Sequence, residues 1–203
     1  PATAGPAACS LLRRGAVAVG PGGGCLLLEG RLGLGGLVGD AVVAFMNPGG
    51  LRVDVLYNQI SGGEQPGEVT YGELFNVQPF GNSLVVKTCT GAQIDALLEQ
   101  QFDNPVVAQQ RFLQVSAGFS YTWDNAAPTG SKVDPSTIKL NGATLAPGTG
   151  YRATMNSFLA SGGDNFVAFN SCTDALGGEI DLDASARYIG DNSPVAPGPQ
   201  NRI

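Results

Sequence analysis

Three short turns contain the residues whose types and spacing favour ligand binding: Asn47-Pro-Gly-Gly-Leu-Arg52, Pro79-Phe-Gly-Asn82 and Phe158-Leu-Ala-Ser-Gly-Gly-Asp164. Glycines let the backbone adopt positive φ angles and let a ligand approach its N–H groups. An arginine offers a planar fork to a carboxylate or phosphate, and an aromatic ring beside a turn offers a flat face to a planar ring. Side-chain amides and carboxylates supply hydrogen-bonding groups that are able to read ring nitrogens or vicinal hydroxyls. Together these groups are the parts of a nucleotide-binding cleft.

The same residues also have purely structural interpretations. General burial tendencies place phenylalanines such as Phe80 and Phe158 in the core about three times as often as at a site. Asp164, after two glycines, is typical of a turn or a helix cap. Arg52 is typical of a surface ion pair. Composition and periodicity alone therefore indicate an α+β domain without choosing a ligand.

The composition excludes several kinds of chemistry. The chain has 203 residues, no histidine and a formal net charge of −6. A Ser-His-Asp or Cys-His nucleophile therefore cannot be built from this chain alone, nor can a histidine-ligated metal site. The negative charge argues against nucleic acid or an anionic membrane as a partner, because phosphates select for Lys/Arg surfaces. No apolar run reaches the ~18 residues of a membrane span.

The cysteines leave their pairing open. Cys9, Cys25, Cys89 and Cys172 show no CxxC spacing, and three pairings are possible for four thiols. Buried free thiols are an equally good interpretation. Because no basic stretch precedes an apolar one at the N-terminus, we expect no signal peptide in this chain.

The hydrophobic pattern predicts an α+β fold, a single layered domain with a mixed β-sheet and a few short helices. Residues 1–38 lack aromatic side chains and are rich in glycine, so we expect an irregular or low-complexity leader before a domain at 39–203. Strands are expected at 41–46, 83–89, 112–123 and 151–155, and a short strand or an extended arm is expected at 53–57. Asn141-Gly142 predicts a hairpin with a type I′ turn.

Two capping-box patterns predict helices. Thr70 precedes a short helix at 71–76, and Thr90 precedes a longer one whose apolar residues share one face and which ends before Pro105. A late helix is expected at 181–188.

Several motifs resemble the C-terminal domain of the 5′-nucleotidase / UDP-sugar hydrolase / 2′,3′-cyclic-nucleotide phosphodiesterase family. The resemblance runs in the family's order from about residue 40 to the C-terminus. The motifs are Val43-Ala-Phe-Met-Asn-Pro-Gly-Gly-Leu-Arg52, Gly67-Glu-Val-Thr-Tyr-Gly-Glu-Leu-Phe75, Gln78-Pro-Phe-Gly-Asn-Ser-Leu84, Thr90-Gly-Ala-Gln-Ile94, Phe112-Leu-Gln-Val-Ser116, Asn156-Ser-Phe-Leu-Ala-Ser-Gly-Gly-Asp-Asn-Phe166 and Gly178-Glu-Ile-Asp-Leu-Asp183.

The resemblance implies a role for each motif residue. Phe80 and Phe158 are similar to the two phenylalanines that sandwich the base, and Asp164 resembles the carboxylate that accepts the ribose hydroxyls. Arg52 resembles a phosphate-binding arginine. The remaining expected substrate-binding residues lie along the base or in the glycine turns: Asn47, Gly50, Asn82, Gly118 and Gly163.

The resemblance also implies a division of labour. In the family, an N-terminal metallophosphoesterase domain holds two divalent metals and the catalytic residues, so we expect no catalytic residue, metal ligand or cofactor in this chain. The chain is expected to bind a nucleoside or nucleotide beside that domain and to hydrolyse nothing alone. A secreted, periplasmic or cell-surface hydrolase is implied, whether nucleotidase, cyclic phosphodiesterase or sugar-nucleotide hydrolase. The alternative is a non-catalytic nucleoside-binding module that retains the fold.

Overall fold

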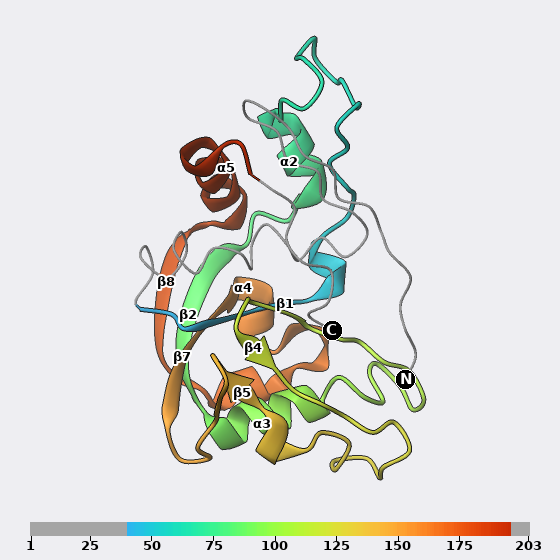
Figure 1. Cartoon of the computed structure of the whole chain (residues 1–203), viewed down its shortest axis with the longest axis vertical. Coiled ribbons are helices and arrows are strands. Elements are labelled where there is room, and N and C mark those ends of the chain that lie inside the picture. The colour runs from blue at the N-terminus through green and yellow to red at the C-terminus, as the bar shows by residue number, and fades with distance from the viewer. Residues whose placement is uncertain (1–39, 196–203) are drawn as a thin grey trace.

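A five-stranded mixed sheet forms the centre of the domain (Figure 1). The computed structural model describes residues 40–195. The strand order is β3-β1-β7-β2-β8. β1 runs parallel to β7, and every other neighbouring pair in this sheet is antiparallel. The strand bounds are β1 (Val43–Met46), β2 (Ser83–Thr90), β3 (Gln114–Val115), β7 (Gly150–Asn156) and β8 (Thr173–Ile180).

Short helices and a second, smaller sheet surround this centre. The antiparallel strands β4 (Phe119–Ser120), β5 (Lys139–Leu140) and β6 (Ala143–Thr144) form the small sheet. The α-helices are α2 (Tyr71–Val77), α3 (Gly91–Glu99), α4 (Ser157–Ala160) and α5 (Asp181–Asn192), and the 3₁₀ turns are η1 (Pro48–Gly50), η2 (Pro135–Thr137), η3 (Gly163–Asn165) and η4 (Val167–Ser171). The predicted α+β fold with a mixed sheet and short helices is confirmed. Within residues 40–195, none of the helices is long and apolar enough to cross a membrane.

Both predicted capping boxes are present. The Thr90 side chain accepts a hydrogen bond from the Gln93 backbone N–H at the start of α3, and the Gln93 side chain accepts one from Thr90 N. Thr70 and Glu73 make the same reciprocal pair at the start of α2. Each box satisfies backbone donors that the first turn of a helix leaves free, which explains why both helices begin where the spacing predicts.

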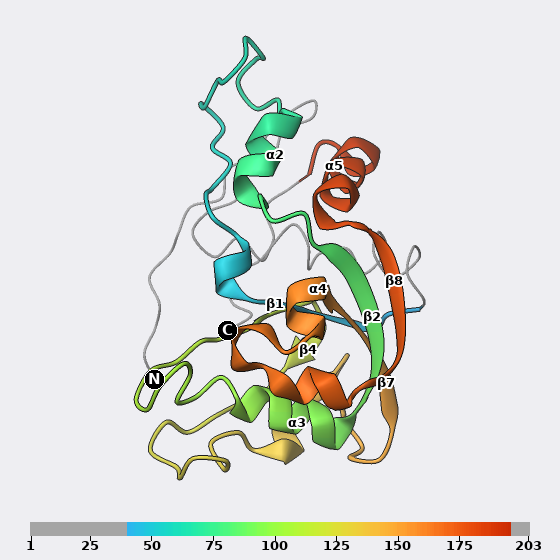
Figure 2. The ribbon, with the colours of Figure 1, turned by 180° about the vertical axis from the view of Figure 1, so that it is seen from behind.

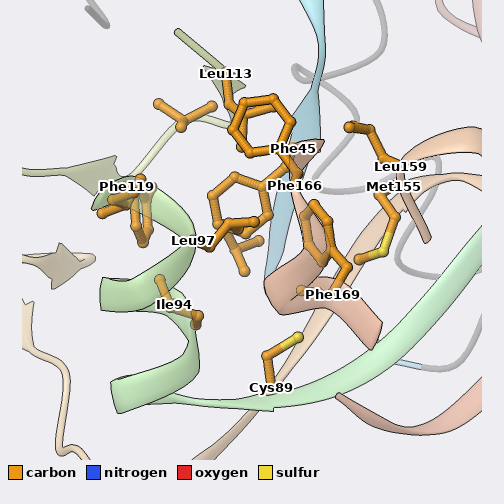
Figure 3. Close-up of a cluster of buried hydrophobic side chains, with 14 of the residues drawn as sticks. Phe45, Cys89, Ile94, Leu97, Leu113, Phe119, Met155, Leu159, Phe166 and Phe169 are labelled. Atoms are coloured by element: carbon orange, nitrogen blue, oxygen red, sulfur yellow. The ribbon is translucent and has the colours of Figure 1, made fainter. Parts of the chain in front are cut away.

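The main core lies between α3 and one face of the sheet (Figure 3). Ile94 and Leu97 point from α3 towards Phe45 of β1 and Met155 of β7, and all four side chains are almost fully buried. Phe169 of η4 closes this cluster, with its ring centroid 6.0 Å from that of Phe45. Aromatic and branched side chains of this size bury the apolar area that stabilises a domain of this length.

The opposite face of the sheet has its own apolar contacts. Alternate residues of β1 and β2 join Ala184 of α5 in a second cluster, comprising Ala44, Met46, Leu84 and Val86. Helices α2 and α5 pack through Leu74, Leu182 and Ile189. Figure 2 shows this helix pair at one end of the sheet and α3 at the other. β1 is therefore buried on both faces, which fixes its position beside β7.

Several predicted elements differ from the observed ones. The expected strand at 112–123 is two short strands, β3 and β4, because the chain turns at Gly118 with φ +85°. Residues 53–57, expected as a short strand or an extended arm, contain a single bridge residue, Val55, and no strand. β8 was not predicted, and α5 extends to Asn192. The Asn141-Gly142 hairpin is confirmed by the β5–β6 pairing, with φ +52° and +82° at the two turn residues.

A disulfide joins Cys89 at the end of β2 to Cys172, which precedes β8. The sequence left this pairing open, and the structure identifies it. Both cysteines are buried. Cys9, Cys25 and the predicted leader at 1–38 lie outside the described residues, so the leader and the proposed domain start stay predictions.

Asp181, the first residue of α5, is expected to make the free energy of unfolding of the domain depend on pH. Its side chain is 2% exposed, and burial raises the pKa to about 6, although the Leu182 backbone N–H donates to its carboxylate. Because this pKa lies above the ordinary value of 3.8, the stabilising contribution is present below about pH 4 and is lost as pH rises through 6. We expect Asp181→Asn to raise the free energy of unfolding by about 2–3 kcal/mol at pH 7.5 and to change it little at pH 4.

Urea unfolding of the parent and the variant at both pH values measures this effect. Asp191→Asn is the matched control, because Asp191 lies exposed near the other end of α5. An equal gain for Asp181→Asn at pH 4 and pH 7.5 would contradict the prediction.

Candidate functional site

The three glycine-containing turns meet around a cavity of about 550 Å³. Its lining includes most of the site residues predicted from the sequence, namely Asn47, Gly50, Arg52, Phe80, Asn82, Phe158 and Asp164, together with Gly49, Arg111 and Asn156. A cavity of this size is in the range that holds a small-molecule ligand.

The parallel pairing of β1 and β7 brings two of these turns together. Ala44 is paired with Thr154, so the carboxyl ends of the two strands lie at the same edge of the sheet. Asn47 follows β1 there, and Asn156 ends β7 and donates from Nδ2 to Asn47 Oδ1 at 3.0 Å. Asn156 Oδ1 also accepts from the Leu159 N–H at 2.8 Å and so caps α4. The buried side-chain amide of Asn156 therefore fixes both the start of α4 and the position of the Asn47 side chain.

Ser157 attaches the third turn to the same edge. Its hydroxyl accepts from the Ser83 N–H and donates to Asn82 Oδ1, both at 3.2 Å. Because Phe158 is the next residue along α4, this contact places the Phe80 turn beside the Phe158 ring. The two phenylalanines therefore reach one cavity from segments far apart in sequence.

The exposure of these two rings separates them from the core phenylalanines. Phe80 is 54% exposed and Phe158 is 45% exposed, whereas Phe166 and Phe169 are fully buried. The general tendency that favoured a core position for Phe80 and Phe158 therefore does not apply to them. Two large apolar rings that line an open cavity supply faces for a planar ligand.

Arg52 lies beside the Phe80 ring. The backbone N–H of Arg52 donates to Val77 O at 2.9 Å, which holds the residue against the end of α2. Its guanidinium carbon is 5.7 Å from the Phe80 ring centroid, and Nη1 donates to Gly49 O at 3.3 Å. The cation therefore stands at the aromatic side of the cavity, where a bound anion would meet it.

Asp164 stands in the left-handed region, with φ 56° and ψ 27°. Its Oδ2 accepts from Asn47 Nδ2 and its Oδ1 from Arg111 Nη1, each at 2.7 Å. A carboxylate offers about four lone-pair positions, so acceptor capacity is left for a ligand. The side chains of Arg111 and Asp164 are 28% and 21% exposed, so the pair is partly screened from water.

Neither of the two remaining predicted glycines, Gly163 and Gly118, is among the residues that line the cavity. A Cβ on Gly163 would lie 2.5 Å from a Phe158 ring carbon, so the absence of a side chain there makes room for the ring. Gly118 lies in the turn between β3 and β4, where a Cβ would meet Asn141 Oδ1 at 2.4 Å. The structure therefore does not bring Gly118 to the site, and the turn itself explains why a glycine is needed.

Three lining residues were not among the predicted site residues: Gly49, Arg111 and Asn156. Asn156 has a sequence signal, because an asparagine before a short apolar helix is a good N-cap. Arg111 precedes a strand and meets Asp164 only across 53 residues of chain, so no local pattern could identify it. Arg52, Arg111 and Asp164 are the charged residues that line the cavity. They give it a local charge of +1 in a chain of net charge −6.

The residues present do not form a metal site. Among residues 40–195, no group of three or more Cys, Asp or Glu side chains is placed to hold a metal ion, and the chain has no histidine. Cys89 and Cys172 are bonded to each other. The metal pair implied by the family resemblance therefore does not fit this part of the chain, and no chemical step is assigned to it here.

Comparison with known proteins identifies the family of this domain. Residues 36–171 match the family described as 5′-nucleotidase, C-terminal domain. The chain belongs to this family.

The similar curated proteins are much longer than this chain. The chain is 35% identical over 159 residues to the trifunctional nucleotide phosphoesterase protein YfkN of Bacillus subtilis, covering 77% of this chain and 10% of that protein. It is 33% identical over 153 residues to the cell wall protein Lmo0130 of Listeria monocytogenes, covering 75% of this chain and 19% of that protein.

A solved structure shows the same relation. The chain superimposes on the 5′-nucleotidase precursor of Thermus thermophilus with a TM-score of 0.73 and 26% identity, covering 96% of this chain and 39% of that chain. The chain thus corresponds to a domain of larger proteins.

Proposed function

We propose that this chain is the substrate-binding domain of a 5′-nucleotidase-type phosphohydrolase and that its cavity binds a nucleoside or nucleotide. The observation that carries the proposal is the meeting of two exposed phenylalanine rings, an arginine and a hydrogen-bonded carboxylate around one cavity. Family membership supports the same conclusion.

Each lining residue has a role in this proposal. Phe80 and Phe158 hold the base between their rings, a contact that tolerates different bases because every base has an aromatic face. The amides of Asn47 and Asn82 face the ligand at its polar edge, and Asp164 accepts hydrogen bonds from the ribose hydroxyls. Arg52 contacts the phosphate.

Catalysis belongs, in this proposal, to a metallophosphoesterase domain outside the 203 residues. Such a domain would hold the metal pair, and the chemistry at the phosphate would be carried out there. The contribution of this chain is to bind and orient the nucleotide, which lowers the entropic cost of the reaction. The Cys89–Cys172 bond supports an extracytoplasmic location for the protein, because disulfides persist in oxidising compartments.

Calorimetric titration of the 203-residue chain with adenosine and with AMP tests the proposal. We expect one binding site for each ligand. Arg52→Met is expected to lower the affinity for AMP about tenfold and to leave the affinity for adenosine almost unchanged, because charge-assisted hydrogen bonds to phosphate are strong. Arg187→Met is the control, since Arg187 pairs with Glu179 and neither residue lines the cavity. If the chain binds neither adenosine nor AMP, the proposed function is contradicted. If this chain releases phosphate from AMP in the presence of a divalent metal, the assignment of catalysis to a separate domain is contradicted.

A further inference from the structure

The sequence motifs do not include Arg111, yet it makes one of the two shortest contacts to the proposed ribose acceptor, Asp164. The Nη1–Oδ1 distance to Asp164 is 2.7 Å, equal to the contact from Asn47 on the other carboxylate oxygen. A third donor, Asn104 Nδ2, reaches the Asp164 backbone carbonyl at 2.9 Å. Asp164 is therefore held by three side chains, two of which, Asn104 and Arg111, come from the segment after α3.

That segment is itself rigidly anchored. The Arg111 N–H donates to Gln101 O at 2.8 Å. Gln101 is fully buried, and its side chain accepts from the Leu113 N–H at 2.8 Å and donates to the Tyr121 hydroxyl at 3.0 Å. Asn104 N donates to Gln109 O at 3.0 Å and closes the loop between them. The guanidinium of Arg111 thus projects from a backbone that the core holds in place.

The geometry fixes the direction of the Asp164 carboxylate. A carboxylate held on one oxygen alone can turn about its χ2 angle, which is a soft torsion. Donors on both oxygens, Arg111 on one side and Asn47 on the other, hold its plane. The lone pairs that these donors leave free then have one orientation relative to the cavity, as recognition of two neighbouring hydroxyls requires.

Resting on the function proposed above, we infer that Arg111 is a positioning residue for Asp164 and thereby sets the preference of the cavity for ribose over deoxyribose. The guanidinium touches the carboxylate, and the carboxylate touches the sugar. The same cation compensates the charge of Asp164, so that the cavity stays attractive to an anionic nucleotide.

Affinities for adenosine, 2′-deoxyadenosine and 3′-deoxyadenosine, measured by calorimetry on the 203-residue chain, test the inference. We expect the parent to prefer adenosine over each deoxy analogue by about tenfold, the worth of a hydrogen bond to a charged group. In Arg111→Met this ratio is expected to fall towards one, while the affinity for the deoxy analogues changes little. Arg187→Met, which removes another arginine paired with a carboxylate, is expected to keep the parent ratio.

The ratio of the affinities for adenosine and its deoxy analogues distinguishes a positioning role of Arg111 from a general effect on stability or charge. The inference is overturned if Arg111→Met lowers the affinity for all three ligands by the same factor, or if it keeps or enlarges the preference for adenosine. Either result leaves the proposed function in place. If the parent binds none of the three ligands, the proposed function and the inference fail together.

Two further variants cover the case in which Arg111→Met does not fold. Arg111→Lys keeps the charge and the aliphatic stem but lacks the planar guanidinium, so we expect a smaller loss of preference in the same direction, and an unchanged ratio overturns the inference. Asp164→Asn should lose the preference by itself. Adding Arg111→Lys to Asp164→Asn should change the ratio no further, because the two residues act as one unit.

Discussion

Replacing Phe80 and Phe158 together by alanine is expected to lower the affinity of the chain for adenosine by about 100-fold, and each single replacement by about tenfold. Stacking of one base on an aromatic side chain contributes about 1–3 kcal/mol when measured by alanine substitution. Both rings are about half exposed, so neither replacement leaves a cavity in the core. The fold should therefore persist, and thermal unfolding of each variant should lie close to that of the parent.

The two rings are not equivalent for a charged ligand. Phe80 also lies beneath the Arg52 guanidinium, so Phe80→Ala should lower the affinity for AMP more than the affinity for adenosine. Phe158→Ala should lower the two affinities by the same factor. Calorimetric titration of both variants with both ligands measures this difference.

Phe75→Ala is the matched control for the clamp. Phe75 is 49% exposed, as the clamp rings are, but lies on α2 and does not line the cavity. Its replacement should leave both affinities unchanged. If Phe80→Ala and Phe158→Ala bind adenosine as tightly as the parent does, the assignment of these rings to the base is wrong.

Removing the disulfide by the double replacement Cys89→Ala and Cys172→Ala is expected to lower the free energy of unfolding by about 4 kcal/mol. The bond closes a loop of 83 residues, and a crosslink stabilises a fold mainly by reducing the conformational entropy of the unfolded chain, more so for long loops. Because domains of this size are stable by only about 5–15 kcal/mol, the loss is a large fraction of the total.

Urea unfolding measures this loss, and reduction of the parent with a thiol should reproduce it. If the double variant unfolds at the same urea concentration as the parent, a stabilising role for the Cys89–Cys172 bond is contradicted.

Local signals predicted the elements that depend on neighbouring residues. Thr90 with Gln93 located the start of α3, and Asn141-Gly142 located a hairpin turn, because capping and turn chemistry act over a few residues. β8 has no such signal. Its sequence is mostly exposed and contains Gly177 and Gly178, and it forms a strand because β2 offers it an edge with which to pair.

The candidate site likewise contains residues that the sequence predicted and residues that only the tertiary structure reveals. The motif residues in the three turns were predicted because family resemblance marked them, and the structure brings most of them to one cavity. Periodicity alone would have placed Phe80 in the core, since burial depends on which face of a turn the sheet covers. Arg111 was missed because its contact with Asp164 depends on how the segment after α3 returns to the cavity.

The Cys89–Cys172 bond also divides the candidate site, because one part of the site lies inside the covalent ring that the bond closes and the other part precedes that ring. Arg111, Asn156, Phe158 and Asp164 lie inside the closed loop, whereas Asn47, Arg52, Phe80 and Asn82 precede it. The mostly exposed residues 124–132 lie inside it as well, so a protease that cuts there leaves both pieces joined through sulfur. Given the proposed function, a chain nicked at this loop is expected to keep its ligand until a reductant is added, because the crosslink still joins the two pieces that carry the candidate site.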